Sequence, residues 1–243
     1  MKKRPKAAPA RSRRPARAPA AGRGQALRRR HPLRRGGPRP GADSSLTRTA
    51  VFAAAAAAFS RRGFDGVAVD DIARAAKVNK AMIYYHFANK RSLYRDIVCE
   101  MLRAAGATVT AIAERPGTAQ DKLAAFVAAF VALSDERPYF PPMMMREIAE
   151  GAPHLDTGAL TLMRSVFAAF ARILAEGEQA GVFRRVNPVL AYMTVLAPLM
   201  LNAARERVGA RPGRGELPMF VYVPHEDLTR HMQGVALRML QKD

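Results

Sequence analysis

Amide, amino, phenol and imidazole groups are concentrated between residues 77 and 90 of this 243-residue chain, in the run KVNKAMIYYHFANK. A helix over Lys80–His86 would bury Ile83 and Phe87. Its outward-facing residues would be Lys80, Ala81, Tyr84 and His86. Lysine and tyrosine side chains of this kind reach phosphate oxygens, and outward groups near a helix N-terminus reach base edges in a DNA groove. The pattern therefore indicates a nucleic-acid contact surface.

The neighbouring elements would position these groups. Apolar residues at i, i+3, i+4 and i+7 predict a preceding helix with one inner face, made of Val69, Ile72, Ala73 and Ala76. Lys77-Val78 breaks that phase, and Asn79 can cap the next helix because its short amide accepts from free N–H groups. Two short helices joined by a tight turn form a helix-turn-helix, whose second helix enters the major groove. The sequence predicts this motif over about residues 68–87.

The net charge of +20 is unevenly distributed. Residues 1–43 contain 15 Lys/Arg and one acidic residue, residues 44–105 contain 10 and 5, and residues 106–243 contain 15 and 14. The positive charge therefore belongs to the N-terminal tail and the helix-turn-helix region. Such a distribution is typical of a nucleic-acid-binding part attached to a nearly neutral body.

The tail, residues 1–43, consists mostly of Arg, Pro, Ala and Gly, and we expect it to be disordered. Three interpretations stay open for it. It is a polycationic arm that adds phosphate contacts, a solvated extension without a specific role, or the product of an upstream GC-rich region if translation starts later. An organellar transit peptide would be Ser-rich and amphipathic, which this tract is not.

Several classes of site are excluded by composition and motifs. One cysteine, Cys99, allows neither an internal disulfide nor a cysteine-based zinc site. On an apolar helix face it is interpreted as a small buried hydrophobe, with a redox-sensing thiol as the alternative. Motifs for metalloproteases, nucleotide binding, hydrolases and dinucleotides are absent from the sequence. We therefore expect no enzyme, no metal site and no cofactor.

No apolar run approaches the roughly 20 residues that span a bilayer, and no apolar segment follows the charged N-terminus as in a secretory signal. We therefore expect a cytoplasmic, nucleoid-associated protein without a membrane partner.

Helical patterns cover most of the remaining chain, so the predicted fold class is all-α. The only strand-like pattern is the brief run at residues 220–223. The expected helices are Ser45–Arg61 with Ser44 or Ser45 as its cap and Gly63 as its C′ residue, Lys90–Ala113, a helix capped by Thr118 and ending before Pro138, a short one at Met143–Glu150, Ala159–Ala180, Val189–Leu201 after an Asn187-Pro188 cap, and His225–Gln241. The helix at Val189–Leu201 is apolar almost all round, so both of its sides must be covered. One side would face the protein's own core and the other a second copy of the chain.

The segment GFDGVAVDDIARAAKVNKAMIYYHFANKRSLYRDIV, residues 63–98, closely resembles the DNA-binding domain of the TetR/AcrR transcriptional regulators. Its most specific part is the YYHF-x-NK-x-x-LY run from Tyr84 to Tyr94. The resemblance implies a three-helix DNA-binding domain at residues 45–105 and an effector-binding and dimerisation domain at residues 106–243. It also implies a homodimer that binds double-stranded DNA at a palindromic operator and represses transcription until a small, largely apolar effector releases it.

By position, the resemblance assigns base or nearby backbone contacts to Asn79, Lys80, Ala81 and Tyr84. It assigns phosphate contacts, or bracing of the helix against phosphates, to Tyr85, His86 and Lys90. Two positions depart from the family pattern. Val67-Ala68 replaces a hydroxyl cap, and Lys77 replaces the turn glycine.

Two further sets of residues are candidates in the body. Met and aromatic residues suited to an apolar effector are Phe126, Phe130, Met144, Met163, Phe167, Phe170 and Tyr192. The alternative is that these residues pack in the hydrophobic core and line no ligand pocket. Candidates for the dimer interface are Leu190, Leu196, Leu199, Met200, Leu228, Met232, Val235 and Met239.

Two other functions remain open from the sequence. One is a sequence-tolerant basic DNA-binding protein driven by the tail. The other is a small-molecule-binding protein whose DNA-binding part is vestigial.

Overall fold

The computed structural model describes the backbone of residues 40–209 and 223–242, and the side chains of residues 44–205 and 223–242. Residues 1–39 of the basic tail and residues 220–222 of the strand-like run lie outside these ranges. Residues 40–43, which we expected to be disordered with the rest of the tail, instead begin the first helix. Within the described ranges the regular structure is helical, apart from an isolated bridge between Phe183 and Gln241. The all-α prediction is confirmed.

The N-terminal helices are α1 (Pro40–Arg62), α2 (Val69–Ala76) and α3 (Lys80–His86). The predicted start of α1 at a Ser44 or Ser45 cap is wrong. Proline suits the first position of a helix, because its φ is preset and its missing N–H would be unpaired there. Ser45 instead lies inside α1, where its carbonyl accepts a hydrogen bond from Thr49 Oγ1 at 3.0 Å.

A left-handed glycine ends α1. Gly63 has φ +73°, and its N–H donates to Phe59 O at 2.8 Å. Phe64 then folds back under the turn, with ring centroids 6.0 Å from Phe59 and 5.4 Å from Tyr94. This confirms the predicted C′ glycine and ties the turn to the next long helix.

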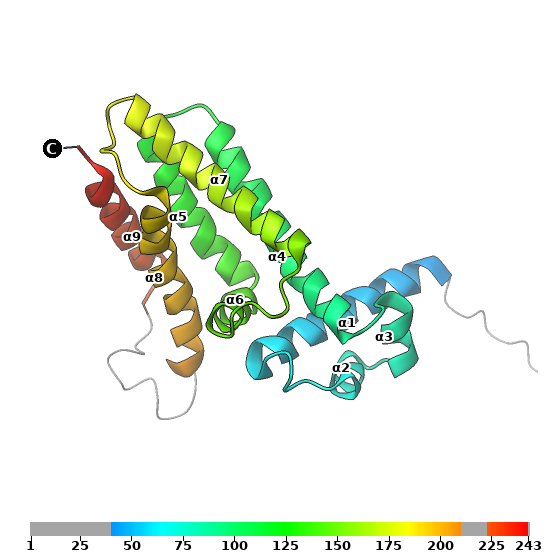
Figure 1. Ribbon diagram of the computed structural model, residues 1–243. Coiled ribbons are helices and arrows are strands. Elements are labelled where there is room, and N and C mark those ends of the chain that lie inside the picture. Colours follow the sequence, from blue (N-terminus) through cyan, green and yellow to red (C-terminus); the bar gives the residue numbers. More distant parts are fainter. Residues whose placement is uncertain (1–39, 210–222, 243) are drawn as a thin grey trace, which may run out of the picture. The chain divides into compact units, whose positions relative to one another are not determined.

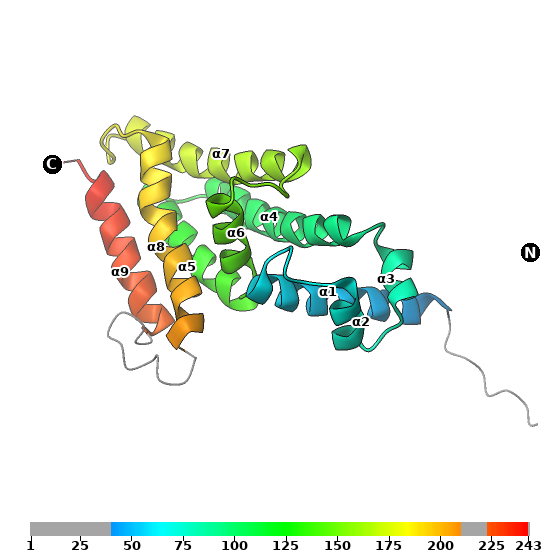
Figure 2. The ribbon, with the colours of Figure 1, turned by 60° about the horizontal axis from the view of Figure 1, so that its bottom comes forward.

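The central helices are α4 (Lys90–Glu114), α5 (Ala119–Glu136), α6 (Phe140–Ala149) and α7 (Thr157–Gln179). Capping boxes start two of them, Asn89 with Ser92 for α4 and Thr118 with Asp121 for α5. The predicted Thr118 cap is therefore confirmed. α7 packs along α4 and α5, as Figures 1 and 2 show.

The C-terminal helices are α8 (Pro188–Gly209) and α9 (His225–Leu240), which lie side by side in Figures 1 and 2. Asn187 caps α8 by accepting from the N–H groups of Val189 and Leu190, as predicted for an Asn-Pro start. α8 continues past the predicted end at Leu201, because the polar residues that follow contain no helix breaker before Gly209. The apolar pattern had identified only its first part.

Two hydrophobic cores organise the described residues. The first joins α1–α3 and the start of α4 to residues of the body, among them Met143, Met144, Ala159 and Met200. The second lies between α5, α7, α8, α9 and the end of α4. α4 passes from one core to the other, with Leu102 in the first and Val109 in the second. The helix-turn-helix is thus seated on the body through a shared core.

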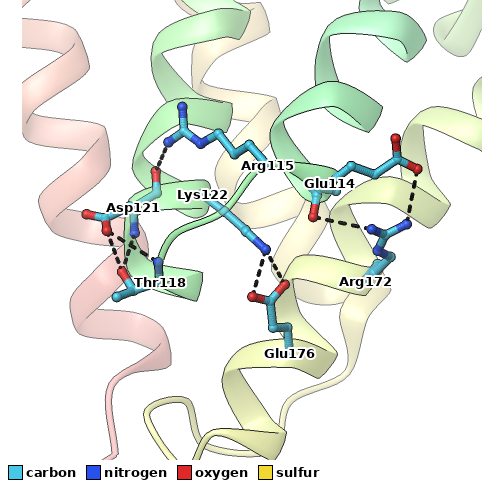
Figure 3. Close-up of polar contacts among 8 residues, drawn as sticks. Glu114, Arg115, Thr118, Asp121, Lys122, Arg172 and Glu176 are labelled. Atoms are coloured by element: carbon cyan, nitrogen blue, oxygen red, sulfur yellow. Dashed lines mark hydrogen bonds and ion pairs between the residues drawn. The ribbon is translucent and has the colours of Figure 1, made fainter.

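Ion pairs link the helices at the end of the body where α4 stops and α5 begins (Figure 3). Lys122 Nζ on α5 lies 2.7 Å from both carboxylate oxygens of Glu176 on α7. Arg172 on α7 donates to Glu114 Oε1 at 3.4 Å and to Ala113 O at 3.4 Å on α4. These contacts fix the register of three helices at one end of the second core.

α7 corrects one expectation. By length and composition its 23 residues could cross a bilayer, with a mean hydropathy of 1.4 over 18 residues. It packs against α4, α5 and α8 and contributes Phe170, Ile173 and Leu174 to the second core. A core helix passes the same composition test, so its length alone does not indicate a membrane span.

Candidate DNA-binding surface

The turn between α2 and α3 is closed by backbone contacts and one helix cap. Lys77 is left-handed, with φ 55° and ψ 40°, and its N–H donates to Arg74 O at 3.3 Å. The Asn79 side chain accepts from the Ala81 N–H at 3.0 Å, which confirms the predicted cap of α3. Both halves of the motif therefore have defined ends.

The two departures from the family pattern have the predicted local consequences. Ala68 occupies the N-cap of α2 in an extended conformation, and no side chain caps that helix. A Ser or Thr cap contributes about 0.5–2 kcal/mol. The left-handed conformation of Lys77 costs a non-glycine residue about 1–2 kcal/mol. The first turn of α2 is therefore less stable than it would be with a Ser or Thr cap, and the turn before α3 is less stable than it would be with a glycine.

Buried side chains hold α3 against the rest of the unit. Ile83 and Phe87 are 1% and 2% exposed, and Ile72 on α2 is fully buried. The guanidinium carbon of Arg48 on α1 lies 5.2 Å from the centre of the Phe87 ring. Because one face of α3 is anchored, its other face has a fixed orientation.

The outer face of α3 brings together most of the predicted contact residues. Tyr84 is 48% exposed and Tyr85 is 74% exposed. Asn79, Lys80 and Ala81, at the start of the helix, are also exposed. Aromatic groups this exposed contribute little to folding, so their phenol groups are available to a partner.

His86 and Lys90 are more enclosed. The His86 ring lies 5.0 Å from the Tyr85 ring, and its Nε2 is buried without a hydrogen-bond partner among the described residues. Lys90 Nζ donates to Phe64 O at 3.0 Å and Val67 O at 3.1 Å and lies 4.1 Å from the Phe64 ring centre. Of the two roles expected for Lys90, the geometry fits bracing of the turn between α1 and α2 rather than an ammonium free to bind phosphate.

Carboxylates at the start of α2 pair with the surrounding cations. Asp71 Oδ2 lies 2.9 Å from Arg62 at the end of α1, and its Oδ1 lies 3.1 Å from Arg74. The hydrogen bond from Arg62 is the largest of the effects that hold the pKa of Asp71 below its usual value. Asp70 Oδ2 lies 2.9 Å from Lys80 Nζ, so it links α2 to the first residue of α3.

A buried polar cluster connects this unit to the body. Tyr94 on α4 donates its hydroxyl to Glu147 Oε1 on α6 at 2.7 Å. The backbone N–H of His154 donates to Glu147 Oε2 at 3.1 Å, and its Nδ1 lies 2.9 Å from Oε1. The exposed fraction is 1% for Glu147 and 9% for His154. Burial and the Glu147 hydrogen bond raise the pKa of Tyr94.

The same cluster contacts the turn after α1. The His154 ring centre lies 4.1 Å from that of Phe64, whose ring also contacts Lys90. Arg91 on α4 donates to Pro153 O at 3.2 Å. A displacement of α6 would therefore reach the helix-turn-helix directly.

The candidate effector residues separate into three places. Phe126, Phe167, Phe170 and Tyr192 form one aromatic group, with ring centres 4.8 Å apart for Phe126 and Phe170 and 5.5 Å apart for Phe167 and Tyr192. Burial raises the pKa of Tyr192 to about 12. The rings fill the space between them, which favours the plain-core interpretation for this group.

The other three candidates lie elsewhere. Met144 and Met163 belong to the first core, packed with the helix-turn-helix, so they do not join the aromatic group. Phe130 instead lines a cavity of about 140 Å³ with residues from α5, α8 and α9. Its other lining residues are Val131, Ser134, Asp135, Pro138, Leu199, Asn202, Ala203, His225 and Leu228. His225 Nδ1 lies 2.7 Å from Asp135 Oδ2 at this cavity.

The predicted dimer residues divide between core and surface. Leu199, Met200 and Met232 are buried in the protein's own cores, and Leu196, Leu228, Val235 and Met239 are partly buried. Of the set, Leu190 is exposed, at 63%. The apolar pattern did not show which side of each helix faces α5, which explains the misassignment of the buried residues.

The exposed apolar side of α8 contains Leu190 and residues outside the predicted set. Val189, Leu190, Met193 and Leu201 are 50%, 63%, 58% and 56% exposed. They recur along one side of the helix with Ala197 and Pro198, which are exposed as well. We call these six residues the α8 face.

Sequence reasoning missed or misplaced several polar residues. Glu147 and His154 form the buried cluster with Tyr94, a role that the sequence pattern did not assign to them. A glutamate at an inward position of the Met-rich helix α6 is the signal that could have identified it. The pairing of Asp70 with Lys80 has no such signal, because it depends on the angle between α2 and α3.

Comparison with known proteins covers both parts of the chain. Residues 51–97 match the family model described as "Bacterial regulatory proteins, tetR family". Residues 120–209 match "Tetracyclin repressor-like, C-terminal domain". Together the two matches extend from the predicted helix-turn-helix into α8.

Curated relatives match over a short stretch of the chain. IcaR of Staphylococcus aureus (strain Newman), the negative transcriptional regulator of the biofilm operon icaADBC, is 48% identical over 40 residues, 16% of this chain and 22% of IcaR. IcaR of Staphylococcus epidermidis is 45% identical over 40 residues, with the same coverage of both chains. The match thus spans about a fifth of these relatives' length.

Solved structures match over most of the chain and have the same fold. The ketosteroid transcriptional regulator KstR2 of Mycobacterium tuberculosis has a TM-score of 0.66 at 18% identity, covering 81% of this chain and 95% of its own. The TetR family regulator PfmR of Thermus thermophilus has a TM-score of 0.63 at 24% identity, covering 77% and 97%. The matching models confirm the prediction of a DNA-binding transcriptional regulator rather than an enzyme, and the solved structures show the same fold: this chain belongs to the TetR family.

Proposed function

We propose that this regulator is a homodimeric repressor that binds a palindromic operator through α3 and is released by a small, largely apolar effector. The observation that carries the proposal is the exposed outer face of α3, with Tyr84 and Tyr85 side by side on an anchored helix. The description of IcaR as a negative regulator supports repression. We assign the DNA-binding domain to residues 45–105, preceded by the start of α1, and the body to residues 106–243.

In this proposal the residues at the start of α3 reach base edges. Asn79, Lys80, Ala81 and Tyr84 occupy the N-terminal part of the exposed face, which lies deepest in the major groove in a helix-turn-helix. Tyr85 contacts the phosphates. His86 and Lys90 act indirectly, because they hold α3 and the turn after α1 in position.

The α8 face is the proposed contact with the second copy. Its large side chains are between 50% and 63% exposed, and they recur along one side of the helix, where the exposed Thr194 interrupts them. Substituting Leu190 and Met193 by Glu would place charge in the interface and should yield monomers in sedimentation. An unchanged mass would remove the α8 face from the proposal.

The cavity between α5, α8 and α9 is the proposed effector site. Its walls are apolar at Phe130, Leu199 and Leu228, and the Asp135–His225 pair provides a polar point. A volume of about 140 Å³ accepts only a small molecule in the conformation described. Small phenols and aromatic amines are suitable probes. Binding of one should raise the thermal midpoint of the protein and should do so less when Leu199→Phe narrows the cavity.

The experiment for the central proposal is selection of bound duplexes from a random-sequence library by the full chain. We expect an inverted repeat whose half-sites lie about 34–36 Å apart, or a multiple of that distance. Enrichment without any repeated sequence would contradict the proposal. We expect the protein to act in the cytoplasm, associated with the nucleoid.

The tail provides the second candidate function, because 15 Lys/Arg in residues 1–43 suffice for sequence-tolerant binding. Removing these residues distinguishes the two. A repressor that reads its operator through α3 keeps its preference for the selected duplex, with a smaller salt dependence. A binder driven by the tail loses its binding altogether.

A further inference from the structure

An acidic residue contacts the first residue of α3. Asp70 Oδ2 lies 2.9 Å from Lys80 Nζ, and the two side chains are 62% and 45% exposed. Asp70 comes from the first turn of α2, so the contact crosses the turn of the motif. It therefore lies on the surface that the proposed function presents to DNA.

The neighbouring carboxylate has a different role. Asp71 pairs with Arg62 and Arg74, which belong to α1 and to α2 itself. These contacts hold the first two helices together. Of the two adjacent carboxylates, Asp70 is the one that forms an ion pair with α3.

A carboxylate at this place changes how Lys80 can act on DNA. A free lysine on a DNA-binding surface neutralises a phosphate and releases a counterion, which strengthens binding to any sequence. A lysine paired with a carboxylate offers less net positive charge to a phosphate. The pair also confines the ammonium group to one position at the start of α3, where base edges are reached.

We propose that Asp70 is a specificity-determining positioning residue, which holds Lys80 at the N-terminus of α3 and withdraws its charge from non-specific phosphate binding. This rests on the proposed function of α3 as the recognition helix. The need for such a device follows from the charge distribution, since the tail alone carries 15 Lys/Arg that favour every duplex equally. When one sequence-independent contact beside α3 is weaker, base contacts contribute a larger share of the binding free energy.

The test compares full-length variants by equilibrium binding to the selected operator and to a mixed-sequence duplex over a range of salt concentrations. The variants are Asp70→Asn, Asp70→Asn with Lys80→Gln, and Lys80→Gln alone. Asp65→Asn is the matched control, because Asp65 is exposed in the turn before α2 and the substitution changes the charge by the same amount. Thermal unfolding verifies that each variant is folded.

With Asp70→Asn, we expect binding to the mixed duplex to strengthen by about fivefold near physiological salt and the salt slope to steepen by about 0.9 per protomer. The preference for the operator should fall. In the Lys80→Gln background, Asp70→Asn should change binding no more than Asp65→Asn does.

Equal effects of Asp70→Asn and Asp65→Asn would overturn the proposal, as would an Asp70→Asn effect that persists without Lys80. If the unmodified protein prefers no sequence, that result contradicts the proposed function. This inference is then contradicted as well, because it rests on that function. That outcome is distinct, because it is measured on the unmodified chain.

Discussion

The two hydrophobic cores differ in the polar groups that they enclose. The first, around the helix-turn-helix, adjoins the buried Glu147, which contacts Tyr94 and His154. The second is built around Phe126, Phe170 and other apolar residues, and its buried cation, Lys122, pairs with Glu176 at one end. Glu176 is 38% exposed, whereas Glu147 is 1% exposed.

The difference indicates that the two cores have different structural roles. Apolar packing is non-directional and supplies stability. Buried hydrogen bonds are directional, and leaving one partner unpaired is costly, so they fix a single arrangement. The first core therefore sets how α4 and α6 hold the helix-turn-helix, and the second mainly stabilises the body.

The largest effect is expected from Glu147→Ala. It leaves the Tyr94 hydroxyl and the His154 N–H without their acceptor in a buried site. Each unpaired group costs about 1–3 kcal/mol, so we expect a loss of about 3 kcal/mol in the free energy of unfolding. Urea unfolding measures it. A loss below about 1 kcal/mol would mean that Glu147 is not an organising contact of the first core.

Lys122→Met tests the other side of the comparison. Glu176 stays partly exposed to water, and the methionine keeps the apolar stem of the lysine. We expect a change of less than about 1 kcal/mol in the same urea experiment. If Lys122→Met destabilises the protein as much as Glu147→Ala does, the two cores do not differ in the way described.

Alkaline pH should weaken the first core through Tyr94. Its pKa is raised in the folded protein, mainly by burial and then by Glu147, from an unfolded value of about 10. The stabilising effect is therefore complete below pH of about 10 and is lost as the pH rises above it. Tyr94→Phe should be less stable than the unmodified protein at neutral pH, by about 1 kcal/mol.

The difference in the free energy of unfolding between Tyr94→Phe and the unmodified protein should shrink as the pH rises. Stability measured at several alkaline pH values checks this. Tyr192 contributes its own loss between pH of about 10 and about 12 in both proteins, so it cancels in the comparison. A difference that is constant over this range would contradict the assignment to Tyr94.

One substitution should stabilise the helix-turn-helix itself. Ala68 already has the extended conformation of an N-cap, so Ala68→Ser adds a hydroxyl acceptor for the free N–H groups of α2. We expect a gain of about 1 kcal/mol in thermal unfolding. Ala68→Val, which has no acceptor, is the matched control. An equal gain from both would show that the cap is not responsible.

Local features were the predictable part of the structure. The Asn79 and Thr118 caps and the C′ glycine Gly63 each follow from residues within one turn, and each was found where predicted. The start of α1 was missed because two serines suggested a cap inside a helix that begins at Pro40.

Features that depend on how helices face one another were not predictable. Met232 and Leu199 are as apolar as Met193 and Leu190, and only packing on α5 and α7 decides which pair is buried. Met144 and Met163 lie away from the aromatic effector candidates for a similar reason, because α6 and α7 place them in or against the first core. The Asp70–Lys80 contact likewise requires the angle between α2 and α3.

The most direct test of the central claim is operator binding by the full chain with Lys80→Ala and Tyr84→Ala together. Both side chains are exposed on α3, so the fold should be unchanged. If α3 reads the operator, preference for it over a mixed-sequence duplex falls by at least about tenfold, since each good base contact contributes about 1–3 kcal/mol. An unchanged preference would contradict the claim, because the operator would then be read by residues other than these two.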